Sequence, residues 1–316
     1  MPITLDDIQD AAERIAALVP QSPLRLSEWL STPAANVHLK LEVVQPTCSY
    51  KIRGACNAVE QFSSSGAAGQ RLVTASAGNH GRALAYAAAL FDLPLTVFIS
   101  AGAPRAKVDA IARSGAELVR CPDYDAAERA AKTFARDGGG VYISPYSHPD
   151  VIAGAGTIGL ELAAQQSDLN TIVVPIGGGG LISGIAIAAK ALLPDARVVG
   201  VEVAASCPFT RSLAAGHLVT IDVQPSLADG LTGNLDPDTL TLDIVRDLVD
   251  DIVVVEEDEL RAALAGVVTN EHLVIEGAAA AGPAALLSGK IQATGNVAII
   301  LSGANVDRSV LADVLR

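Results

Sequence analysis

Short apolar runs alternate along the whole chain with longer segments rich in Ala. The runs are rich in Val, Ile and Leu and predict strands at 37–41, 71–75, 95–99, 117–121, 141–144, 171–176, 197–203, 252–256 and 296–301. Between them, apolar residues at helical spacing predict helices at 81–90, 126–135, 182–192 and 260–268. Continuously apolar strands separated by helices indicate parallel sheets covered on both faces. The predicted fold class is therefore α/β.

Open parallel sheets bind ligands beyond the carboxyl ends of their strands, so motifs directly after strands matter most. The run 171–176 is followed by Gly177, Gly178, Gly179, Gly180 and Leu181. Consecutive glycines carry a large backbone entropy cost, and the usual reason for them is a path whose N–H groups converge on an anion. No Lys-Ser/Thr pair follows, so this is not a P-loop. A merely tight turn is the alternative.

Two further polar turns follow strands. Ser76-Ala77-Gly78-Asn79-His80-Gly81 comes after 71–75, with Ser76 placed as an N-cap before N–H groups that could hold a carboxylate. Ser302 ends the last apolar run, at the same predicted edge. The alternatives are a capping turn with nothing bound for the first and an ordinary N-cap for Ser302.

Lys51 lies beyond the strand-like stretch 37–41, near the start of a predicted helix. The positive end of a helix dipole favours nucleophilic use of an amine placed there. The alternative is that Lys51 and the nearby Arg53 belong to a solvated face.

Composition narrows the class of protein. The 316 residues are 50% hydrophobic but only 3% aromatic, and the net charge of −13 argues against nucleic acid or an anionic membrane as partner. The four cysteines have no CxxC spacing, the N-terminus is acidic where a secretory signal would be basic, and no apolar run is long enough for a membrane span. We therefore expect a cytoplasmic protein.

Gly154-Ala155-Gly156-Thr157-Ile158-Gly159 fits the dinucleotide pattern G-x-G-x-x-G. It follows Ser147-His148-Pro149-Asp150 instead of a strand, and a glycine stands where the pattern needs an acid about 20 residues on. We expect a helix packed closely through its glycines. A dinucleotide-dependent dehydrogenase is the alternative.

Taken in order, four motifs resemble the serine/threonine dehydratase family. They are Ser-Tyr-Lys-Ile-Arg-Gly-Ala from Ser49, Ser-Ala-Gly-Asn-His-Gly from Ser76, the tetraglycine with Leu181, and Leu-Ser-Gly-Ala-Asn from Leu301. These fold-type II pyridoxal-phosphate enzymes include serine racemase and the dehydratases of hydroxyectoine utilisation. The resemblance implies two open parallel-sheet lobes of the tryptophan synthase beta-like kind, with pyridoxal 5'-phosphate in the cleft. It also implies a large domain of 1–63 and 148–316, a small domain of 64–147, and a homodimer.

The resemblance further implies a role for each motif. Lys51 is expected to carry the cofactor and to act as the catalytic base, with Tyr50 beside it. The backbone of Gly177, Gly178, Gly179, Gly180 and Leu181 is expected to hold the phosphate. Asn79 is expected to hydrogen-bond the ring hydroxyl of the cofactor, and Ser302 is expected to meet its ring nitrogen. The substrate carboxylate is expected to bind Ser76, Asn79 and His80.

Ser302 and Ala77 decide the predicted reaction. A serine carries no charge that would keep the ring nitrogen protonated, so the cofactor is a weaker electron sink and loss of a β-hydroxyl is favoured over transamination. Racemases of the family have a second serine where this chain has Ala77, which cannot exchange a proton. We expect a dehydratase that converts a serine-, threonine- or hydroxyaspartate-like substrate to a 2-oxo acid and ammonia. A racemase and a catalytically silent binding protein are the alternatives.

Several positions depart from the family pattern. Glu202 and Ser206 match two positions of a divalent-cation site, but Pro208 stands where a ligating Asp is expected, so no metal is predicted. Cys48 replaces a glycine, Ala155 replaces a glutamine, and Glu276-Gly277-Ala278 lacks the proline of a Glu-Pro-Ala motif.

Overall fold

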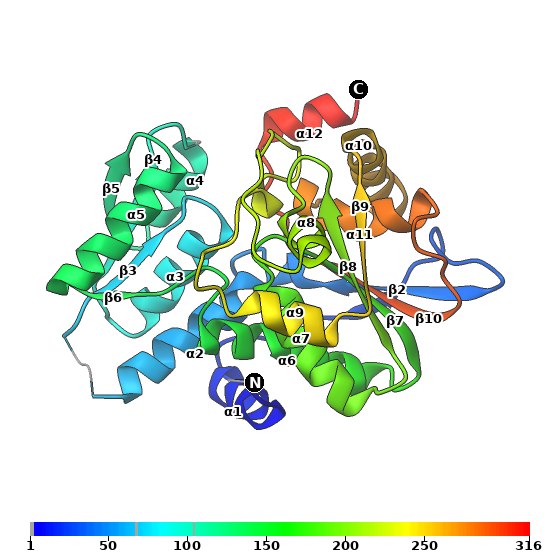
Figure 1. Ribbon diagram of the computed structural model, residues 1–316, viewed down its shortest axis with the longest axis horizontal. Coiled ribbons are helices and arrows are strands. Elements are labelled where there is room, and N and C mark those ends of the chain that lie inside the picture. The colour runs from blue at the N-terminus through cyan, green and yellow to red at the C-terminus, as the bar shows by residue number, and fades with distance from the viewer. Residues whose placement is uncertain (1–2, 67–68, 104) are drawn as a thin grey trace.

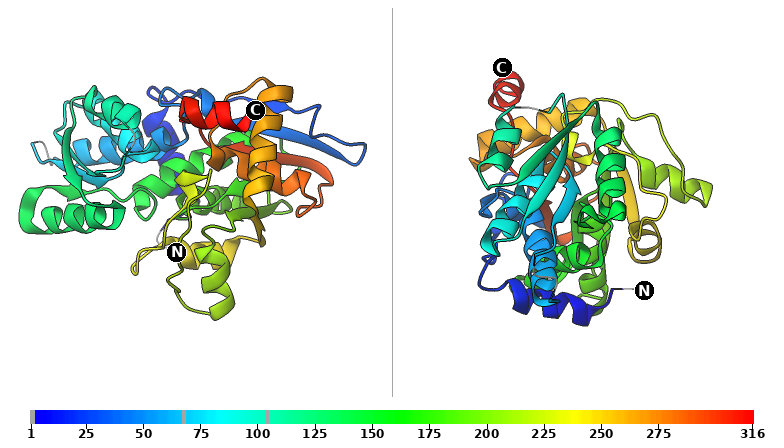
Figure 2. Two further views of the ribbon diagram at one scale, coloured as in Figure 1. Left: turned by 90° about the horizontal axis from the view of Figure 1, so that it is seen from above. Right: turned by 90° about the vertical axis from the view of Figure 1, so that its left-hand side faces the viewer.

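The computed structural model describes residues 3–66, 69–103 and 105–316. Two sheets lie side by side, and the smaller one, with helices α3, α4 and α5, forms the left-hand part of Figure 1. Helix α2 packs against both α3 and α6 and so joins the two parts. Figure 2 shows the same two parts from above and from the side of the smaller sheet.

The larger sheet has six strands in the order β1-β2-β10-β7-β8-β9. All neighbours are parallel except β1 and β2. The strands are β1 Leu24–Leu26, β2 Ala35–Leu41, β7 Leu169–Pro175, β8 Arg197–Val203, β9 Asp251–Val255 and β10 Gly295–Leu301.

Helices cover both faces of this sheet because each central strand is apolar on both sides. Val173 and Ile299 are fully buried in one core cluster with residues of α10 and α11. Ile172 and Ile300 are fully buried in a second cluster with residues of α6 and α7. The helices of this part are α1 Leu5–Ile15, α2 Lys51–Ser64, α6 Pro149–Gln165, α7 Gly180–Leu192, α8 Pro208–Ala215, α9 Thr241–Leu248, α10 Glu257–Gly266, α11 Gly277–Leu287 and α12 Arg308–Val314.

The smaller sheet is parallel throughout, in the order β5-β4-β3-β6. Its strands are β3 Leu72–Ala75, β4 Leu95–Ser100, β5 Glu117–Cys121 and β6 Val141–Tyr142, and its helices are α3 Asn79–Leu90, α4 Arg105–Ala112 and α5 Tyr124–Phe134. All four strands fall inside 64–147, and we propose that range as the small domain.

Each strand and helix expected from the sequence is present; β5 and β8 have the predicted ends, and the ends of the others are shifted. The three-residue antiparallel β1 was missed because Leu24–Leu26 is too short to show a pattern. Gly154, Gly156 and Gly159 lie inside α6, not in a strand-to-helix turn. A Cβ on Gly154 would fall 2.6 Å from the Arg53 carbonyl oxygen of α2, and one on Gly159 would fall 2.6 Å from Ala188 Cβ of α7. The predicted close packing is confirmed, and a dinucleotide site there is excluded because the strand-turn-helix geometry is missing.

Candidate active site

Lys51 is the first residue of α2, and its side chain is half-buried. Its Nζ donates to the carbonyl oxygen of Pro145 over 2.6 Å and lies 5.0 Å from the centre of the Tyr50 ring. The amine is therefore held at the start of the helix, next to the segment that leads from β6 into α6.

Arg53, two residues on, is fully buried, so the alternative of a solvated face is wrong for this residue. Its guanidinium forms paired hydrogen bonds with the buried carboxylate of Glu42, at 2.8 Å each. It also donates to Glu161 over 2.6 and 3.0 Å. These carboxylates outweigh the effect of burial, which alone would lower the pKa of Arg53, and the pKa is raised. The network anchors the first turn of α2, which carries Lys51.

The tetraglycine turn joins β7 to α7 and packs tightly against Tyr146. A Cβ on Gly178 would lie 2.2 Å from the Tyr146 ring, and one on Gly180 would lie 2.7 Å from the Tyr146 carbonyl oxygen. Gly179 has φ of 84°, a left-handed conformation that favours glycine. Because Tyr146 follows Pro145, the turn and the Lys51 amine meet at the same two residues.

The N–H groups of the turn are left without helical acceptors. Within the described chain, the first N–H of this stretch with a backbone acceptor is that of Ser183, which donates to Gly179 over 2.9 Å. The amides before it, at the start of α7, form a set of donors at the positive end of a helix dipole. Such a set binds an anion such as a phosphate group.

The β3–α3 turn presents a second set of donors. The N-cap of α3 is Gly78, so the prediction of Ser76 as N-cap is wrong by two residues. The Ser76 hydroxyl instead accepts from Gly78 N–H over 3.2 Å, because the chain bends before the helix begins. The first helical bond runs from Arg82 N–H to the Gly78 carbonyl oxygen, which leaves the earlier amides of α3 available for a carboxylate.

His80 is buried with its Nε2 3.3 Å from the carbonyl oxygen of Ile143. Burial, followed by the nearby Lys51 charge, lowers the pKa of His80 to about 3. The neutral ring donates through Nε2 to this carbonyl, and Nδ1 can then only accept. What His80 offers to a carboxylate is therefore its backbone N–H and not its imidazole.

The end of β10 closes the site from the large sheet. Ser302 is buried, and its carbonyl oxygen accepts from Tyr50 N–H over 3.0 Å. Ser49 and Gly303 form an isolated antiparallel bridge, and Ala304 N–H donates to the Cys48 carbonyl oxygen. Cys48 has φ of 56°, a conformation in which glycine is usual. The two motifs that contain Lys51 and Ser302 are thus hydrogen-bonded side by side.

Glu276, to which the sequence assigned no role, lies between the Asn79 turn and the segment after β10. Its buried carboxylate accepts from Asn79 Nδ2 over 2.6 Å, and its N–H donates to the Gly303 carbonyl oxygen over 3.0 Å. Burial, followed by the charge of Asp229, raises the pKa of Glu276 to about 7. The signal in the sequence was the Glu-Gly-Ala likeness to Glu-Pro-Ala, which gave no partner.

Glu202, which matches the first position of the cation pattern, is hydrogen-bonded within the protein. Its fully buried carboxylate accepts from Phe209 N–H over 2.9 Å, from Thr210 N–H over 2.8 Å and from Thr210 Oγ1 over 2.6 Å. Both carboxylate oxygens thus accept hydrogen bonds from the start of α8, which begins at Pro208. Among the described residues, no cluster of three or more His, Cys, Asp or Glu side chains could hold a metal.

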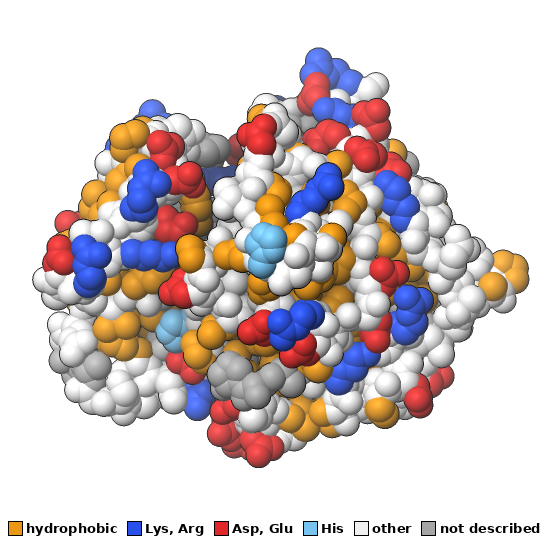
Figure 3. All heavy atoms as spheres, in the orientation of Figure 1, with side chains coloured by type: hydrophobic (Ala, Val, Ile, Leu, Met, Phe, Trp, Pro, Cys, Tyr) orange, Lys and Arg blue, Asp and Glu red, His pale blue; other side chains and the backbone are white. Residues whose placement is uncertain are grey.

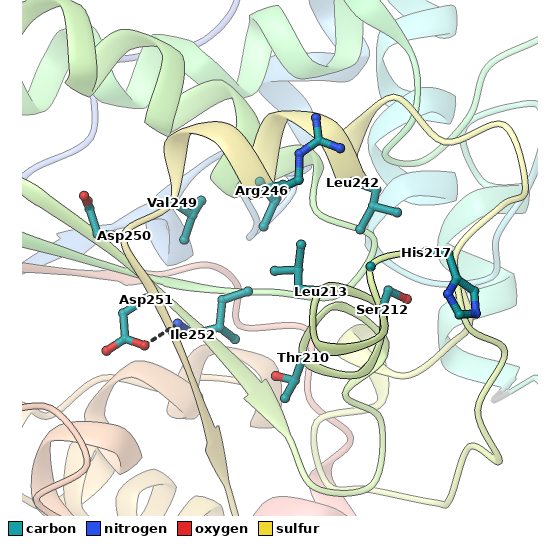
Figure 4. A pocket seen from close by; sticks show the side chains of 12 residues that line it. Thr210, Ser212, Leu213, His217, Leu242, Arg246, Val249, Asp250, Asp251 and Ile252 are labelled. Atoms are coloured by element: carbon teal, nitrogen blue, oxygen red, sulfur yellow. Dashed lines mark hydrogen bonds between the residues drawn. The ribbon is translucent and has the colours of Figure 1, made fainter.

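A separate cavity of about 430 Å³ lies between α8, α9 and β9 (Figure 4). Leu213, Leu242 and Ile252 supply apolar walls, and the Arg246 guanidinium is bound by Asp243 and Asp247. No candidate site residue lines it. The face shown in Figure 3 mixes Lys and Arg with Asp and Glu. In the described part of the chain, no helix is both long enough and apolar enough to cross a membrane.

Comparison with known proteins identifies the family. The model of the pyridoxal-phosphate dependent enzymes matches residues 15–303. The chain belongs to this family. It is 38% identical to the catabolic L-threonine dehydratase of Escherichia coli K12, over 99% of this chain and 96% of that one. It is 36% identical to L-threo-3-hydroxyaspartate ammonia-lyase of Saccharomyces cerevisiae, over 99% and 96%. The structure of maize serine racemase superposes with a TM-score of 0.92 at 33% identity, over 99% and 97%.

The cofactor of this family is pyridoxal 5'-phosphate, and the residues present fit it. The Lys51 amine, which can carry the aldehyde, contacts Pro145, and the donor set at the start of α7 packs against Tyr146. The buried Ser302 is hydrogen-bonded to Tyr50, next to Lys51. The N–H donors at the start of α7 suit the phosphate of the cofactor, and the uncharged Ser302 hydroxyl suits its ring nitrogen.

Proposed function

We propose that this enzyme is a pyridoxal-phosphate-dependent ammonia-lyase that removes water from a β-hydroxy amino acid. The enamine that results takes up water again on hydrolysis, so the net products are a 2-oxo acid and ammonia. One observation carries the proposal more than any other. The Lys51 Nζ and the tetraglycine turn meet at Pro145 and Tyr146, so one small molecule with an aldehyde and a phosphate can reach both. The full-length similarity to threonine and hydroxyaspartate ammonia-lyases supports the reaction class.

The residues of this chain have distinct tasks in the proposed reaction. Lys51 carries the cofactor and, once freed, takes the Cα proton on its Nζ. The N–H groups from Gly177 to Leu181 hold the phosphate, and those at the start of α3 hold the substrate carboxylate. Bound pyridoxal phosphate supplies the electron sink for the charge left at Cα.

Ser302 and Ala77 restrict the outcome. The Ser302 hydroxyl is uncharged and does not stabilise a protonated ring nitrogen, which favours departure of the β-hydroxyl. Ala77 lies between Ser76 and Gly78, in the turn before α3, and its methyl group neither gives nor takes a proton. Although serine racemases are among the similar proteins, the proposal is elimination without inversion.

The first experiment tests Lys51. The purified protein should be yellow, and borohydride should bleach it and attach the cofactor to Lys51, as peptide mass spectrometry would show. Lys51→Ala should lose the covalent attachment and ammonia release, whereas Lys190→Ala, which removes a surface amine from α7, should keep both. Turnover by Lys51→Ala would contradict the proposal.

The second experiment identifies the substrate. Ammonia release should be measured for the stereoisomers of serine, threonine, hydroxyaspartate and phenylserine. The best substrate should be one of these β-hydroxy amino acids, and none should be racemised at a comparable rate. Inversion of L-serine to D-serine by the unmutated enzyme would favour the racemase instead.

We also propose that the enzyme works in the cytoplasm as a homodimer. All four cysteines are free thiols in the structure, which is typical of a reducing compartment. Size measurement by light scattering tests the dimer.

A further inference from the structure

We infer that Arg82, Asn305 and Glu276 are positioning residues that fix the side-chain amide of Asn79 in one orientation, with a free N–H presented to an acceptor oxygen of the bound cofactor. The inference rests on the proposed function, in which Asn79 meets the ring hydroxyl. It concerns the three residues behind Asn79, which come from α3, from the segment after β10 and from the start of α11.

The hydrogen bonds form one continuous relay. The Arg82 guanidinium donates to Asn305 Oδ1. Asn305 Nδ2 donates to Asn79 Oδ1 over 2.6 Å and to the Thr47 carbonyl oxygen over 3.0 Å. Asn79 Nδ2 then donates to the Glu276 carboxylate over 2.6 Å.

The Arg82 end gives the relay its direction. A guanidinium can only donate a hydrogen bond. Asn305 must therefore turn its oxygen toward Arg82 and its amide nitrogen toward Asn79. Asn79 in turn must direct its oxygen toward Asn305 and its nitrogen toward Glu276. An isolated asparagine could flip its amide, but this one cannot without breaking two hydrogen bonds.

One N–H of Asn79 stays unused in this arrangement. Its Nδ2 carries two hydrogens, and Glu276 takes one of them. The second is the group that can donate to a phenolic oxygen. The carboxylate of Glu276 is buried, and the relay also gives it one of its hydrogen bonds, which a buried charge requires.

The test reverses the two hydrogen bonds of the Asn79 amide. Asn305→Asp can still accept from Arg82 but cannot donate to Asn79, so the Asn79 amide should turn and place its oxygen against Glu276. Adding Glu276→Gln supplies an amide donor for that oxygen, so both bonds of the Asn79 amide are restored in the opposite sense, whereas the bond from residue 305 to the Thr47 carbonyl oxygen stays lost in both variants. The readouts are the thermal stability of the cofactor-free protein, the Kd for pyridoxal phosphate, and the visible absorption maximum of the bound cofactor.

Asn305→Asp alone should lose both thermal stability and cofactor affinity. The double variant should regain part of the stability that Asn305→Asp loses, but it should bind the cofactor roughly tenfold or more weakly, with a displaced absorption maximum, because the N–H donor is gone. The exposed Asn36→Asp, at the amino end of β2, adds the same charge and should change neither cofactor readout.

A double variant with unchanged Kd and unchanged absorption maximum would overturn the inference. Arg82→Met provides a milder second variant, because it releases one end of the relay without adding charge, and it should shift the absorption maximum in the same direction. Unaltered cofactor properties in Arg82→Met would also count against the relay. If the unmutated protein itself binds no cofactor at Lys51, the proposed function is wrong, and so is this inference, which rests on it.

Discussion

At the scale of single residues, the stability of the protein depends strongly on the buried charges around Arg53. Arg53 and Glu42 are 1% and 0% exposed, and Glu161 is 15% exposed. Glu161 also pairs with the buried Lys40 over 2.5 Å. Burial would raise the pKa of Glu161, but Arg53 and Lys40 lower it overall. Each charge is tolerated because its partners are in place.

We therefore predict that Arg53→Met destabilises the protein strongly. The substitution leaves the Glu42 carboxylate buried without its paired donors, which costs about 3–5 kcal/mol of unfolding free energy. Denaturant unfolding checks this value. Arg53→Met combined with Glu42→Gln should recover part of the loss, since the stranded charge is then removed. Arg246→Met, on the surface of α9, is the control and should leave the unfolding free energy nearly unchanged, because exposed ion pairs contribute little.

Glu276 gives a prediction about pH in the cofactor-free protein. Its pKa is raised by burial from the ordinary 4.5 to about 7, so the folded state binds a proton that the unfolded state releases between these values. This contribution to stability is complete below pH 4.5 and disappears as pH rises through 7. The lowered pKa of His80 acts in the opposite direction, so the comparison must be made with Glu276→Gln. The unfolding free energy of the unmutated protein should decline more steeply over this window, and parallel curves would contradict the assignment.

At the scale of elements, the tetraglycine turn is defined by close approach as well as by backbone conformation. We predict that Gly179→Ala impairs both folding and cofactor binding, because its Cβ would lie 2.5 Å from the Phe209 ring at a φ of 84°. Gly216→Ala is a matched control, since Gly216 has φ of 73° with open space around it. The control should lose only about 1–2 kcal/mol. Unfolding curves and the Kd for pyridoxal phosphate measure both effects.

The elements and the motifs were accessible from the sequence, whereas their partners were not. Apolar runs and local turns predicted the strands, the start of α2 and the three turns after strands, because these depend on neighbouring residues. The partners of Arg53, Glu42 and Glu161, lie 11 and 108 positions away along the chain. Glu276, the partner of Asn79, lies 197 positions away. No spacing rule connects such residues, because only the tertiary packing of separate elements, such as α2 on α6 and α3 near the start of α11, brings them together.

At the scale of the whole molecule, the two sheets are bridged by ion pairs between helices of the smaller part and the segment between α8 and α9. Lys107 of α4 pairs with Asp229 over 2.6 Å, and Lys132 of α5 pairs with Asp236 over 2.5 Å. Asp236 N–H also donates to Tyr146 Oη over 2.8 Å, and the Tyr146 ring covers Gly178. The bridge is therefore connected to the tetraglycine turn.

We predict that Lys132→Met loosens the contact between the two parts and weakens substrate binding without releasing the cofactor. Lys132 lies between Asp236 and Glu128, and its loss leaves two carboxylates facing each other across the gap. Because the pair is partly exposed, it contributes up to about 1 kcal/mol, so KM should rise about two- to fivefold while the cofactor absorption stays unchanged. Lys290→Met removes another partly exposed pair, with Glu259, inside the larger part and should leave KM unchanged. Raising the salt concentration should increase KM for the unmutated enzyme more than for Lys132→Met, since salt screens the same pair. Equal salt dependence in both would show that the ion pair of Lys132 has no part in substrate binding.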